Sequence, residues 1–328
     1  MMHILLTALL LASSLPQEED VVIMGSGPAG MTAAIYAARS GLSTLVIEGD
    51  ETGGQIALSY KVDNFPGFPE GISGEELVEN MRKQAFRFGA RIQSSKVSSV
   101  DMSKRPFLLK LEGGKEIIAK SIIIASGAST KWLEIPSEAA LIGKGVNSCA
   151  VCDAPFFIDK EVVVVGGGDS ALEDALYLAN YASKVTVIHR SENLRASKYL
   201  QEQVSLNQKI QYVWNATIDE IKDPINEKVT GVNLRDVETK KVRFFPCEGV
   251  FVAIGHAPNT QLFIGELDLD QAGYIVTKAH STETAIEGVF AAGDVADPKY
   301  RQAITAAGSG SMAAIDAYQF IQKQKGKK

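Results

Sequence analysis

Two cysteines whose spacing suits redox chemistry stand near the middle of the chain. Cys149 and Cys152 form a C-x-x-C pair, and the acid Asp153 follows immediately. Thiolates attack disulfides, but a free thiol has a pKa of about 8.5, so such a pair needs assistance at neutral pH. Asp153 is the candidate proton donor and acceptor, with a helix cap or a solvated surface residue as the alternative. The pair therefore indicates exchange of electrons with a disulfide.

A glycine-rich turn near the start of the chain has the pattern that binds the pyrophosphate of a dinucleotide. The apolar run 21–24 predicts a buried parallel strand and 44–47 the next one, with an alanine-rich helix ending near Gly41 between them. Glu48 follows the second strand and can accept hydrogen bonds from a ribose diol. Together these parts indicate a site for FAD or NAD, in which the turn consists of Gly25, Ser26, Gly27, Pro28, Ala29 and Gly30.

A second turn of the same kind begins shortly after the cysteine pair. Buried strands are predicted at 162–165 and 185–188, with a helix through Leu178 between them. His189 stands as far from this turn as Glu48 stands from the first, and Arg190 and Arg195 follow. Guanidinium groups suit a 2′-phosphate, so this is the candidate NADPH site, unless both arginines are ordinary surface residues. The turn consists of Gly166, Gly167, Gly168, Asp169, Ser170 and Ala171.

Length and composition define the kind of protein that carries these motifs. A chain of 328 residues exceeds what one core usually organises, so two domains are expected. The net charge of −6 argues against a nucleic-acid partner, whose phosphates would need a basic face. A structural zinc site needs four ligands, which three cysteines and four scattered histidines do not supply, so no metal is expected. Cys247 is left over as an inert, partly buried thiol.

The N-terminus carries an apolar run, 4–15, that has some features of a secretion signal. No Lys or Arg precedes it, and it is too short to span a bilayer. We therefore expect a cytoplasmic protein without membrane attachment, since its expected cofactors are loaded and regenerated in the cytosol. Residues 1–19 would be an extension, and those before Asp20 dispensable. A cleaved signal is the alternative.

With these parts placed, the chain resembles the low-molecular-weight thioredoxin reductases over about residues 20–320. The resemblance rests on both turns, the C-x-x-C pair and further segments in the order of that family. These segments are Thr52-Gly53-Gly54-Gln55, Asn64-Phe65-Pro66-Gly67, Ala125-Ser126-Gly127-Ala128, Val252-Ala253-Ile254-Gly255-His256, Gly293-Asp294-Val295 and Tyr300-Arg301-Gln302-Ala303-Ile304-Thr305.

The resemblance implies an α/β fold with two Rossmann-like dinucleotide-binding domains, the NADPH domain being inserted into a discontinuous FAD domain. The FAD domain would comprise residues 20–131 and 260–328, and the NADPH domain, with the cysteine pair, residues 132–259. The resemblance further implies a homodimer. Electrons would pass from NADPH through FAD and a Cys149–Cys152 disulfide to thioredoxin or a thioredoxin-like protein, with domain rotation between the half-reactions.

The resemblance implies that the catalytic and cofactor-binding residues of the family have counterparts at matching positions of this sequence. Catalysis would fall to Cys149, Cys152 and Asp153, with Cys152 as the sulfur that meets both flavin and thioredoxin. The FAD contacts, besides the first turn, would be Glu48, Gly49, Gly54, Gln55, Asn64, Gly127, Gly293, Asp294, Arg301, Gln302 and Ala303. The NADPH contacts, besides the second turn, would be Glu173, His189, Arg190, Arg195, Ile254 and Gly255.

Two departures from the family pattern bear on function. Ser191 stands where a second arginine is usual, which would weaken the preference for NADPH over NADH. Ala154 and Pro155 follow Asp153 where glycine is usual, and they stiffen the turn beside the dithiol. Related flavoproteins reduce ferredoxin without such cysteines, or use oxygen without NADPH. The intact C-x-x-C pair and the second turn argue against both alternatives.

Overall fold

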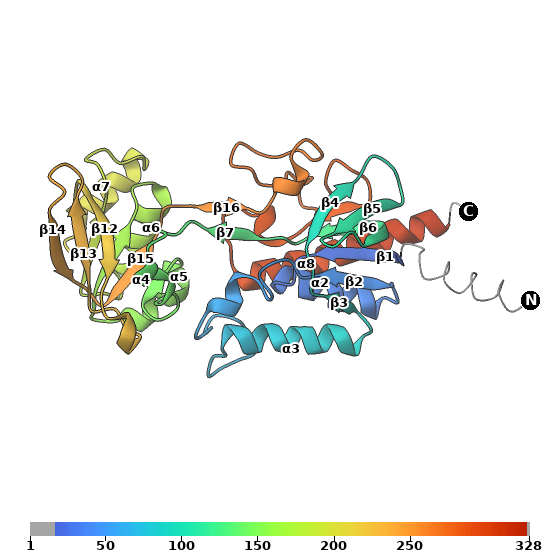
Figure 1. Ribbon diagram of the computed structural model, residues 1–328, viewed down its shortest axis with the longest axis horizontal. Helices are drawn as coiled ribbons and strands as arrows, with labels where there is room; N and C mark the ends of the chain where they lie inside the picture. Colours follow the sequence, from blue (N-terminus) through green and yellow to red (C-terminus); the bar gives the residue numbers. More distant parts are fainter. Residues whose placement is uncertain (1–16, 327–328) are drawn as a thin grey trace, which may run out of the picture.

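The computed structural model describes residues 17–326, which form two lobes joined by a narrow ribbon (Figure 1). One lobe is built from two separate parts of the chain, residues 17–130 and 256–326, and we call it the discontinuous lobe. The other consists of residues 131–255, and we call it the inserted lobe. The apolar run 4–15 lies outside the described residues.

The discontinuous lobe is built on a mostly parallel sheet. Its strand order is β3 (Arg91–Gln93), β2 (Thr44–Ile47), β1 (Gln17–Met24), β6 (Glu116–Ile124), β5 (Phe107–Leu111) and β4 (Val97–Asp101), and β17 (Val289–Ala291) also pairs with β6. Two pairs of this sheet are antiparallel within the described chain, β4 with β5 and β5 with β6, and the other pairs are parallel. The strands are rich in fully buried Val and Ile because helices or loops cover both faces.

Helices α2 (Pro28–Arg39) and α8 (Ala303–Lys325) pack together against this sheet, and α3 (Gly74–Arg87) packs beside α2. The predicted strand 44–47 and the helix ending near Gly41 are confirmed. α3 begins at an N-cap, Ser73, whose side chain accepts the backbone N–H of Glu76 at 3.1 Å. Two short 3₁₀ helices, η1 (Gln55–Leu58) and η5 (Gly293–Val295), complete the wall that faces the inserted lobe.

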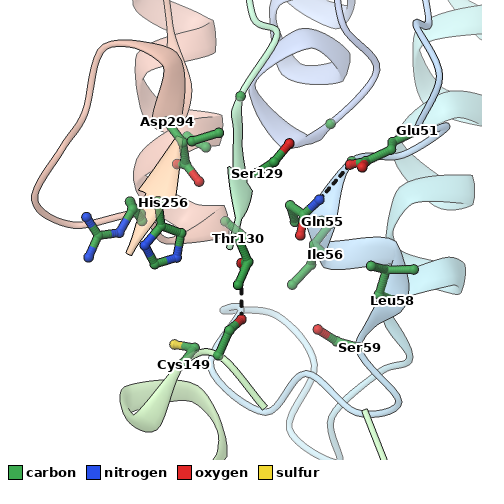
Figure 2. Close-up of a pocket in the computed structure, with 18 of the residues that line it drawn as sticks. Glu51, Gln55, Ile56, Leu58, Ser59, Ser129, Thr130, Cys149, His256 and Asp294 are labelled. Atoms are coloured by element: carbon green, nitrogen blue, oxygen red, sulfur yellow. Dashed lines mark hydrogen bonds between the residues drawn. The ribbon is translucent and has the colours of Figure 1, made fainter. Parts of the chain in front are cut away.

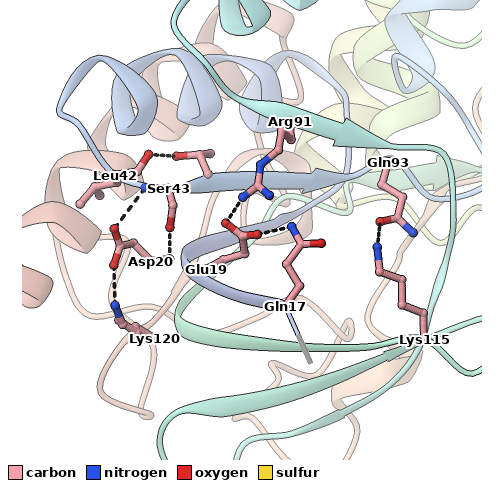
Figure 3. A network of polar contacts seen from close by, with 10 residues as sticks. Gln17, Glu19, Asp20, Leu42, Ser43, Arg91, Gln93, Lys115 and Lys120 are labelled. Atoms are coloured by element: carbon pink, nitrogen blue, oxygen red, sulfur yellow. Dashed lines mark hydrogen bonds and ion pairs between the residues drawn. The ribbon is translucent and has the colours of Figure 1, made fainter. Parts of the chain in front are cut away.

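Strand β1 begins at Gln17 rather than at Val21, where the apolar run begins. Gln17 and Glu19 pair with Ile117 and Ala119 of β6. Glu19 is fully buried, and its carboxylate accepts hydrogen bonds from Arg91 and from Gln17 (Figure 3). A buried carboxylate is stable only when paired in this way, and the sequence pattern does not reveal the pairing. The first strand therefore begins four residues earlier than the apolar run 21–24 indicates, and residues 17–19 belong to the sheet rather than to an extension.

The inserted lobe contains a second, wholly parallel sheet. Its order is β11 (Ile210–Val213), β10 (Lys184–Ile188), β9 (Glu161–Val165), β15 (Gly249–Val252) and β8 (Val146–Asn147). Helices α6 (Asp169–Leu178) and α7 (Lys198–Leu206) contact each other beside it, and an antiparallel meander is formed by β12 (Ala216–Ile221), β13 (Gly231–Asp236) and β14 (Val242–Pro246). The strands and the helix predicted around the second turn are confirmed. The lobe also carries α4 (Pro136–Ala139), α5 (Ala150–Asp153) and η2 (Ala154–Phe157).

A two-stranded antiparallel ribbon connects the lobes. It pairs β7 (Ala128–Thr130) with β16 (His256–Pro258), and the Lys131 amide donates to the carbonyl of Gly255 at 3.0 Å just beyond it. In Figure 1 the ribbon spans the gap between the lobes. The fold class is confirmed, because the described chain contains two parallel α/β sheets, one of them inserted into the other unit. None of the helices within residues 17–326 has the length and apolar content that crossing a bilayer requires.

Candidate active site

A cavity of about 1260 Å³ lies between the two lobes and is lined by residues of both. Its walls carry the first glycine-rich turn from one lobe and the cysteine pair from the other. Figure 2 shows Cys149 at one end of the view, with His256 and Asp294 on one side and Gln55 on the other. The volume exceeds the roughly 1,000 Å³ that bounds most pockets for small molecules, which suits an extended ligand.

The first turn has the shape of a dinucleotide cradle. Gly25 has a φ of 114°, and a Cβ there would lie 2.2 Å from the carbonyl oxygen of Ala125. A Cβ at Gly30 would lie 2.0 Å from the carbonyl oxygen of Gly25. Both positions therefore accept only glycine. The turn leads into α2, whose first residues line the cavity, so a helix N-terminus is available for a pyrophosphate.

Glu48 lines the same cavity, but its carboxylate already has partners. The side chain is 1% exposed, and Arg82 and Ser94 both donate hydrogen bonds to it. Each carboxylate oxygen keeps a further lone pair, so a ribose hydroxyl can still donate to Glu48. Arg82 comes from α3, and no local pattern in the sequence connects it to Glu48.

Another part of the cavity wall is formed by η5 and the start of α8. Burial raises the pKa of Asp294 in η5 to about 6; the nearby Asp297 acts in the same direction, and Arg301 opposes both. α8 begins at Ala303 with Gln302 as its N-cap, so unpaired amides and the positive end of the helix dipole lie at the cavity. These groups fit the sugar-like chain and the electron-rich ring edge of a flavin.

The cysteines are joined in a disulfide that lines the cavity. Cys149 is the N-cap of α5, and its Sγ accepts the backbone N–H of Cys152 at 3.2 Å. Gln302 reaches the pair from the discontinuous lobe: its Nε2 lies 3.8 Å from Cys149 Sγ and its Oε1 3.9 Å from Cys152 Sγ. Asn64 donates to the same Oε1 at 3.4 Å. The disulfide thus contacts residues expected to hold the flavin.

Besides Asp294, three further titratable side chains in this cavity have strongly shifted pKa values. Burial raises the pKa of Asp153 to about 7, so a carboxyl next to the disulfide can hold a proton near neutral pH. Burial also raises the pKa of Asp174 in α6 to about 7. Burial, with the charges of Arg301 and Lys131, lowers the pKa of His256 to about 4, so its imidazole is neutral. The sequence analysis singled out only Asp153 of these three.

The second turn lies away from this cavity, apart from Ser170, which lines it. A Cβ at Gly167 would lie 2.3 Å from the ring of His189, which is buried and packs over the turn. Asp169 accepts the backbone N–H of Ser197 at 2.6 Å, and the amide of Arg195 donates to the carbonyl of Gly167 at 2.7 Å. The segment that follows β10 is thereby folded back onto the turn. Arg190 and Arg195 both remain exposed there, free to meet a phosphate.

The cavity gathers most, though not all, of the predicted site residues. It is lined by Cys149, Cys152, Asp153 and every residue predicted for FAD except Gly30, which packs behind the turn. Of the residues predicted for NADPH it includes only Ser170, Glu173 and Gly255. Those it does not include are Gly166, Gly167, Gly168, Asp169, Ala171, His189, Arg190, Arg195 and Ile254.

The remaining cysteine and the histidines form no further centre. Cys247 is free and buried, and burial raises the pKa of its thiol to about 12, which makes it unreactive. No group of three His, Cys, Asp or Glu side chains within residues 17–326 is arranged to hold a metal ion.

The chain carries two turns of the dinucleotide-binding type, and its redox disulfide lines the cavity between the lobes. These features define a nucleotide-dependent disulfide oxidoreductase. Residues 19–310 match the pyridine nucleotide-disulphide oxidoreductase family, and the chain belongs to it, among the low-molecular-weight thioredoxin reductases that use FAD and NADPH. The thioredoxin reductase of Rickettsia prowazekii is 53% identical over 304 residues, which are 92% of this chain and 98% of that one.

Two solved structures extend the comparison. The thioredoxin reductase of Streptococcus pyogenes MGAS5005 has 39% identity and a TM-score of 0.89, covering 94% of this chain and all (100%) of that one. The thioredoxin reductase of Lactococcus lactis in its "FR conformation" has 40% identity over 93% of this chain and 99% of that one, but a TM-score of 0.61. At nearly equal identity, the two structures differ greatly in how well they superpose on this chain.

Proposed function

We propose that this protein transfers electrons from NADPH, by way of FAD and the Cys149–Cys152 disulfide, to the disulfide of thioredoxin or a thioredoxin-like protein. The observation that carries the proposal is the contact of Gln302 with both sulfurs, at 3.8 and 3.9 Å. It joins a redox disulfide of the inserted lobe to a wall of the discontinuous lobe that suits a flavin.

The residues of the cavity divide the binding of FAD between them. The turn Gly25–Gly30 and the start of α2 would hold the pyrophosphate, and Glu48 would hold a ribose. Asp294 would accept hydrogen bonds from the sugar-like chain, and Gln302 with the start of α8 would bind the ring. Bound FAD supplies the chemistry that accepts a hydride from NADPH and passes two electrons to a disulfide.

The cysteine pair carries the electrons to the partner by thiol–disulfide exchange. A thiolate of the reduced pair attacks the thioredoxin disulfide and forms a mixed disulfide, which the second cysteine then resolves. One disulfide forms in this protein and one is opened in thioredoxin, so two electrons and two protons leave together. Asp153 accepts a proton from one thiol and delivers it to the thiolate released on the partner. We assign Cys152 as the attacking sulfur.

The second turn must reach the flavin for hydride transfer, although the disulfide faces the cavity in this structure. We therefore propose that the inserted lobe rotates about the ribbon β7–β16, and we name the arrangement seen here the disulfide-inward arrangement. The low TM-score of the Lactococcus lactis structure at 40% identity supports the rotation. The proposed domain boundaries at 131 and 259 lie close to this ribbon.

Three finer features complete the proposal. Arg190 and Arg195 select NADPH, and Ser191 contributes no charge to this selection. The protein is a homodimer, and the large apolar side chains of α2 and α8 that remain exposed are candidates for its interface: Tyr36, Ile304, Met312, Ile315 and Tyr318. It acts in the cytoplasm, where NADPH is regenerated.

Anaerobic titration of the purified yellow protein with NADPH tests the proposed path. Uptake of four electrons per subunit is expected, two by the flavin and two by the disulfide. Uptake of only two electrons would show that the disulfide takes no part and would contradict the proposal.

A further inference from the structure

The two lobes meet at a second place besides the contact of Gln302 with the disulfide. Gly143 of the inserted lobe lies against the backbone of the discontinuous lobe: a Cβ at Gly143 would lie 2.9 Å from the carbonyl oxygen of Leu58 and 3.8 Å from the amide nitrogen of Tyr60. Side chains do not approach other atoms within 3.0 Å in this way. All three residues line the cavity, and Figure 2 shows Leu58 across the view from Cys149. Only a residue without a side chain therefore fits at position 143.

The backbone that carries Gly143 is held in place within the inserted lobe. The amide of Gly143 donates to the carbonyl of Val146 at 2.9 Å, and the amides of Lys144 and Val146 both donate to the carbonyl of Leu141, at 2.8 and 3.1 Å. This turn leads directly into β8, and Cys149 stands two residues after β8 ends. Gly143 thus belongs to the same short segment as the disulfide, and any displacement of the turn is passed on to the disulfide.

The backbone on the other side of the contact is also fixed. Leu58 is the last residue of η1, and the amide of Ser59 donates to the carbonyl of Ile56 at 3.0 Å. Gly74, the first residue of α3, donates its amide to the carbonyl of Ser59 at 2.9 Å. Because α3 packs on both η1 and α2, the carbonyl of Leu58 is attached to the body of the discontinuous lobe. A side chain at position 143 would therefore push the lobes apart rather than move a loop aside.

The cost of a side chain at position 143 has two parts, and only one of them depends on the arrangement of the lobes. Gly143 has a φ of 74°, so any other residue would be strained there whether or not the lobes rotate. The overlap with Leu58 arises only in the disulfide-inward arrangement, since rotation about the ribbon carries Gly143 away with the inserted lobe. A side chain would thus disfavour the disulfide-inward arrangement relative to the rotated one.

We propose that Gly143 is a positioning residue: the absence of a side chain there lets the lobes close far enough for the disulfide to reach the flavin cavity. The inference rests on the rotation given under the proposed function. It gives Gly143 a part in the transfer of electrons from the flavin to the disulfide, and none in the transfer of hydride from NADPH to the flavin.

Three variants separate the overlap from the backbone strain. Gly143→Ala adds one Cβ at the contact. Gly143→Asn adds the same Cβ on a residue that tolerates a left-handed backbone better, so it replaces Gly143→Ala if that variant does not fold. Gly265→Ala is the matched control, because Gly265 has a φ of 84° and a Cβ there would meet nothing within 4 Å. The control therefore has the strain without the overlap.

The distance between the lobes tests the inference without measuring turnover. Asn80→Cys in α3 and Gln203→Cys in α7 place spin labels on exposed positions, which lie below and above the line of the ribbon in Figure 1. In the oxidised protein the labels attach only there, because Cys149 and Cys152 are bonded to each other and Cys247 is buried. NADP⁺, which donates no electrons, is added to a concentration at which the unchanged protein shows both label separations.

Under these conditions Gly143→Ala and Gly143→Asn should each lower the ratio of the disulfide-inward to the rotated population about tenfold, the usual effect of one overpacked group. Gly265→Ala should leave the ratio unchanged. An unchanged ratio in the Gly143 variants would overturn the inference alone. A single separation in every variant and at every NADP⁺ concentration would instead overturn the proposed rotation.

Anaerobic stopped-flow absorbance provides a second readout, because it separates the two half-reactions. In Gly143→Ala, reduction of the disulfide by the reduced flavin should slow in proportion to the lost population of the disulfide-inward arrangement. Reduction of the flavin by NADPH should be at least as fast as in the unchanged protein. If both steps slowed by the same factor, the variant would have a general defect and the proposed role of Gly143 would be wrong.

Discussion

The side-chain amide of Gln302 lies 3.8 Å from the sulfur of Cys149, although 153 positions separate the two residues in the chain. Gln302 precedes α8 in the discontinuous lobe, and Cys149 precedes α5 in the inserted lobe. Each residue is the N-cap of its helix, so two helix N-termini meet across the cavity at the disulfide. Both dipoles favour negative charge at this place, which suits thiolates and a reduced flavin.

The contact predicts an effect of Gln302→Ala on the internal electron transfer. The variant should keep FAD but pass electrons from the reduced flavin to the disulfide about five- to tenfold more slowly, since one or two weak polar contacts are lost. Anaerobic stopped-flow absorbance measures this step. Gln322→Ala, at the exposed far end of α8, is the control. An unchanged rate in Gln302→Ala would show that the contact has no part in the transfer.

Replacing either cysteine should separate the two half-reactions. Cys149→Ser and Cys152→Ser should each abolish reduction of thioredoxin, yet retain FAD and its reduction by NADPH, because the sulfurs lie outside both glycine-rich turns. Absorbance of the flavin and a coupled thioredoxin assay measure the two activities. Turnover near the unmodified rate in either variant would contradict the dithiol relay. Trapping the mixed disulfide with the remaining cysteine would identify the attacking sulfur.

Asp153→Asn should lose the proton donor of the exchange. A general acid or base contributes about 100-fold or more to the rate, so thioredoxin turnover should fall by that factor while reduction of the flavin by NADPH is unaffected.

The same variant, Asp153→Asn, should also become more stable than the unmodified protein as the pH rises. The folded pKa of about 7 lies above the ordinary 3.8, so the stability due to Asp153 is complete below about pH 4 and is lost on approaching pH 7.

Melting temperatures at about pH 5 and pH 8 measure this difference. The advantage of Asp153→Asn should be greater at pH 8, where the buried aspartate is ionised. A constant difference between the two proteins across this range would mean that Asp153 does not titrate with a raised pKa.

The preference for NADPH over NADH should depend on the residue at position 191. The hydroxyl of Ser191 donates a hydrogen bond to the carbonyl of Asn193 at 3.3 Å. A charged hydrogen bond contributes roughly 1.5–3 kcal/mol, so Ser191→Arg should raise the ratio of kcat/KM for NADPH over NADH by about tenfold or more. Steady-state assays with both nucleotides measure it. Equal rates with NADH and NADPH in the unmodified enzyme would contradict phosphate recognition by Arg190 and Arg195.

The N-terminal strand gives a prediction of stability. A variant that begins at Asp20 loses Gln17–Glu19 from β1 and leaves Arg91 without its buried partner. We expect its free energy of unfolding to fall by about 2 kcal/mol or more, as strand hydrogen bonds and a partly buried ion pair are lost. Urea titration compares it with a variant that begins at Gln17. Equal midpoints for the two would show that residues 17–19 add nothing to the sheet.

The sequence was most informative where one local pattern determines one local structure. Both glycine-rich turns, their flanking strands and helices, and the C-x-x-C pair could be predicted, because steric limits on the backbone confine these turns to glycine. The buried ion pairs of Glu19 and Glu48 could not be recognised in the same way. Glu19 is paired with Arg91 and Glu48 with Arg82, and these partners meet only in the folded chain. Polar residues whose partners are distant in sequence resemble ordinary surface residues.

One lobe is inserted into the other at the ribbon β7–β16, and this insertion also determines the order in which the two lobes can fold during synthesis on the ribosome. The inserted lobe is one continuous segment, and all of its strands have been synthesised once β15 ends at Val252. The discontinuous lobe must wait, because its sheet includes β17 and its α2 packs on α8, at the end of the chain. The part of the molecule that carries the cysteine pair can therefore fold before the flavin cavity exists, and its thiols are exposed to oxidants during that interval.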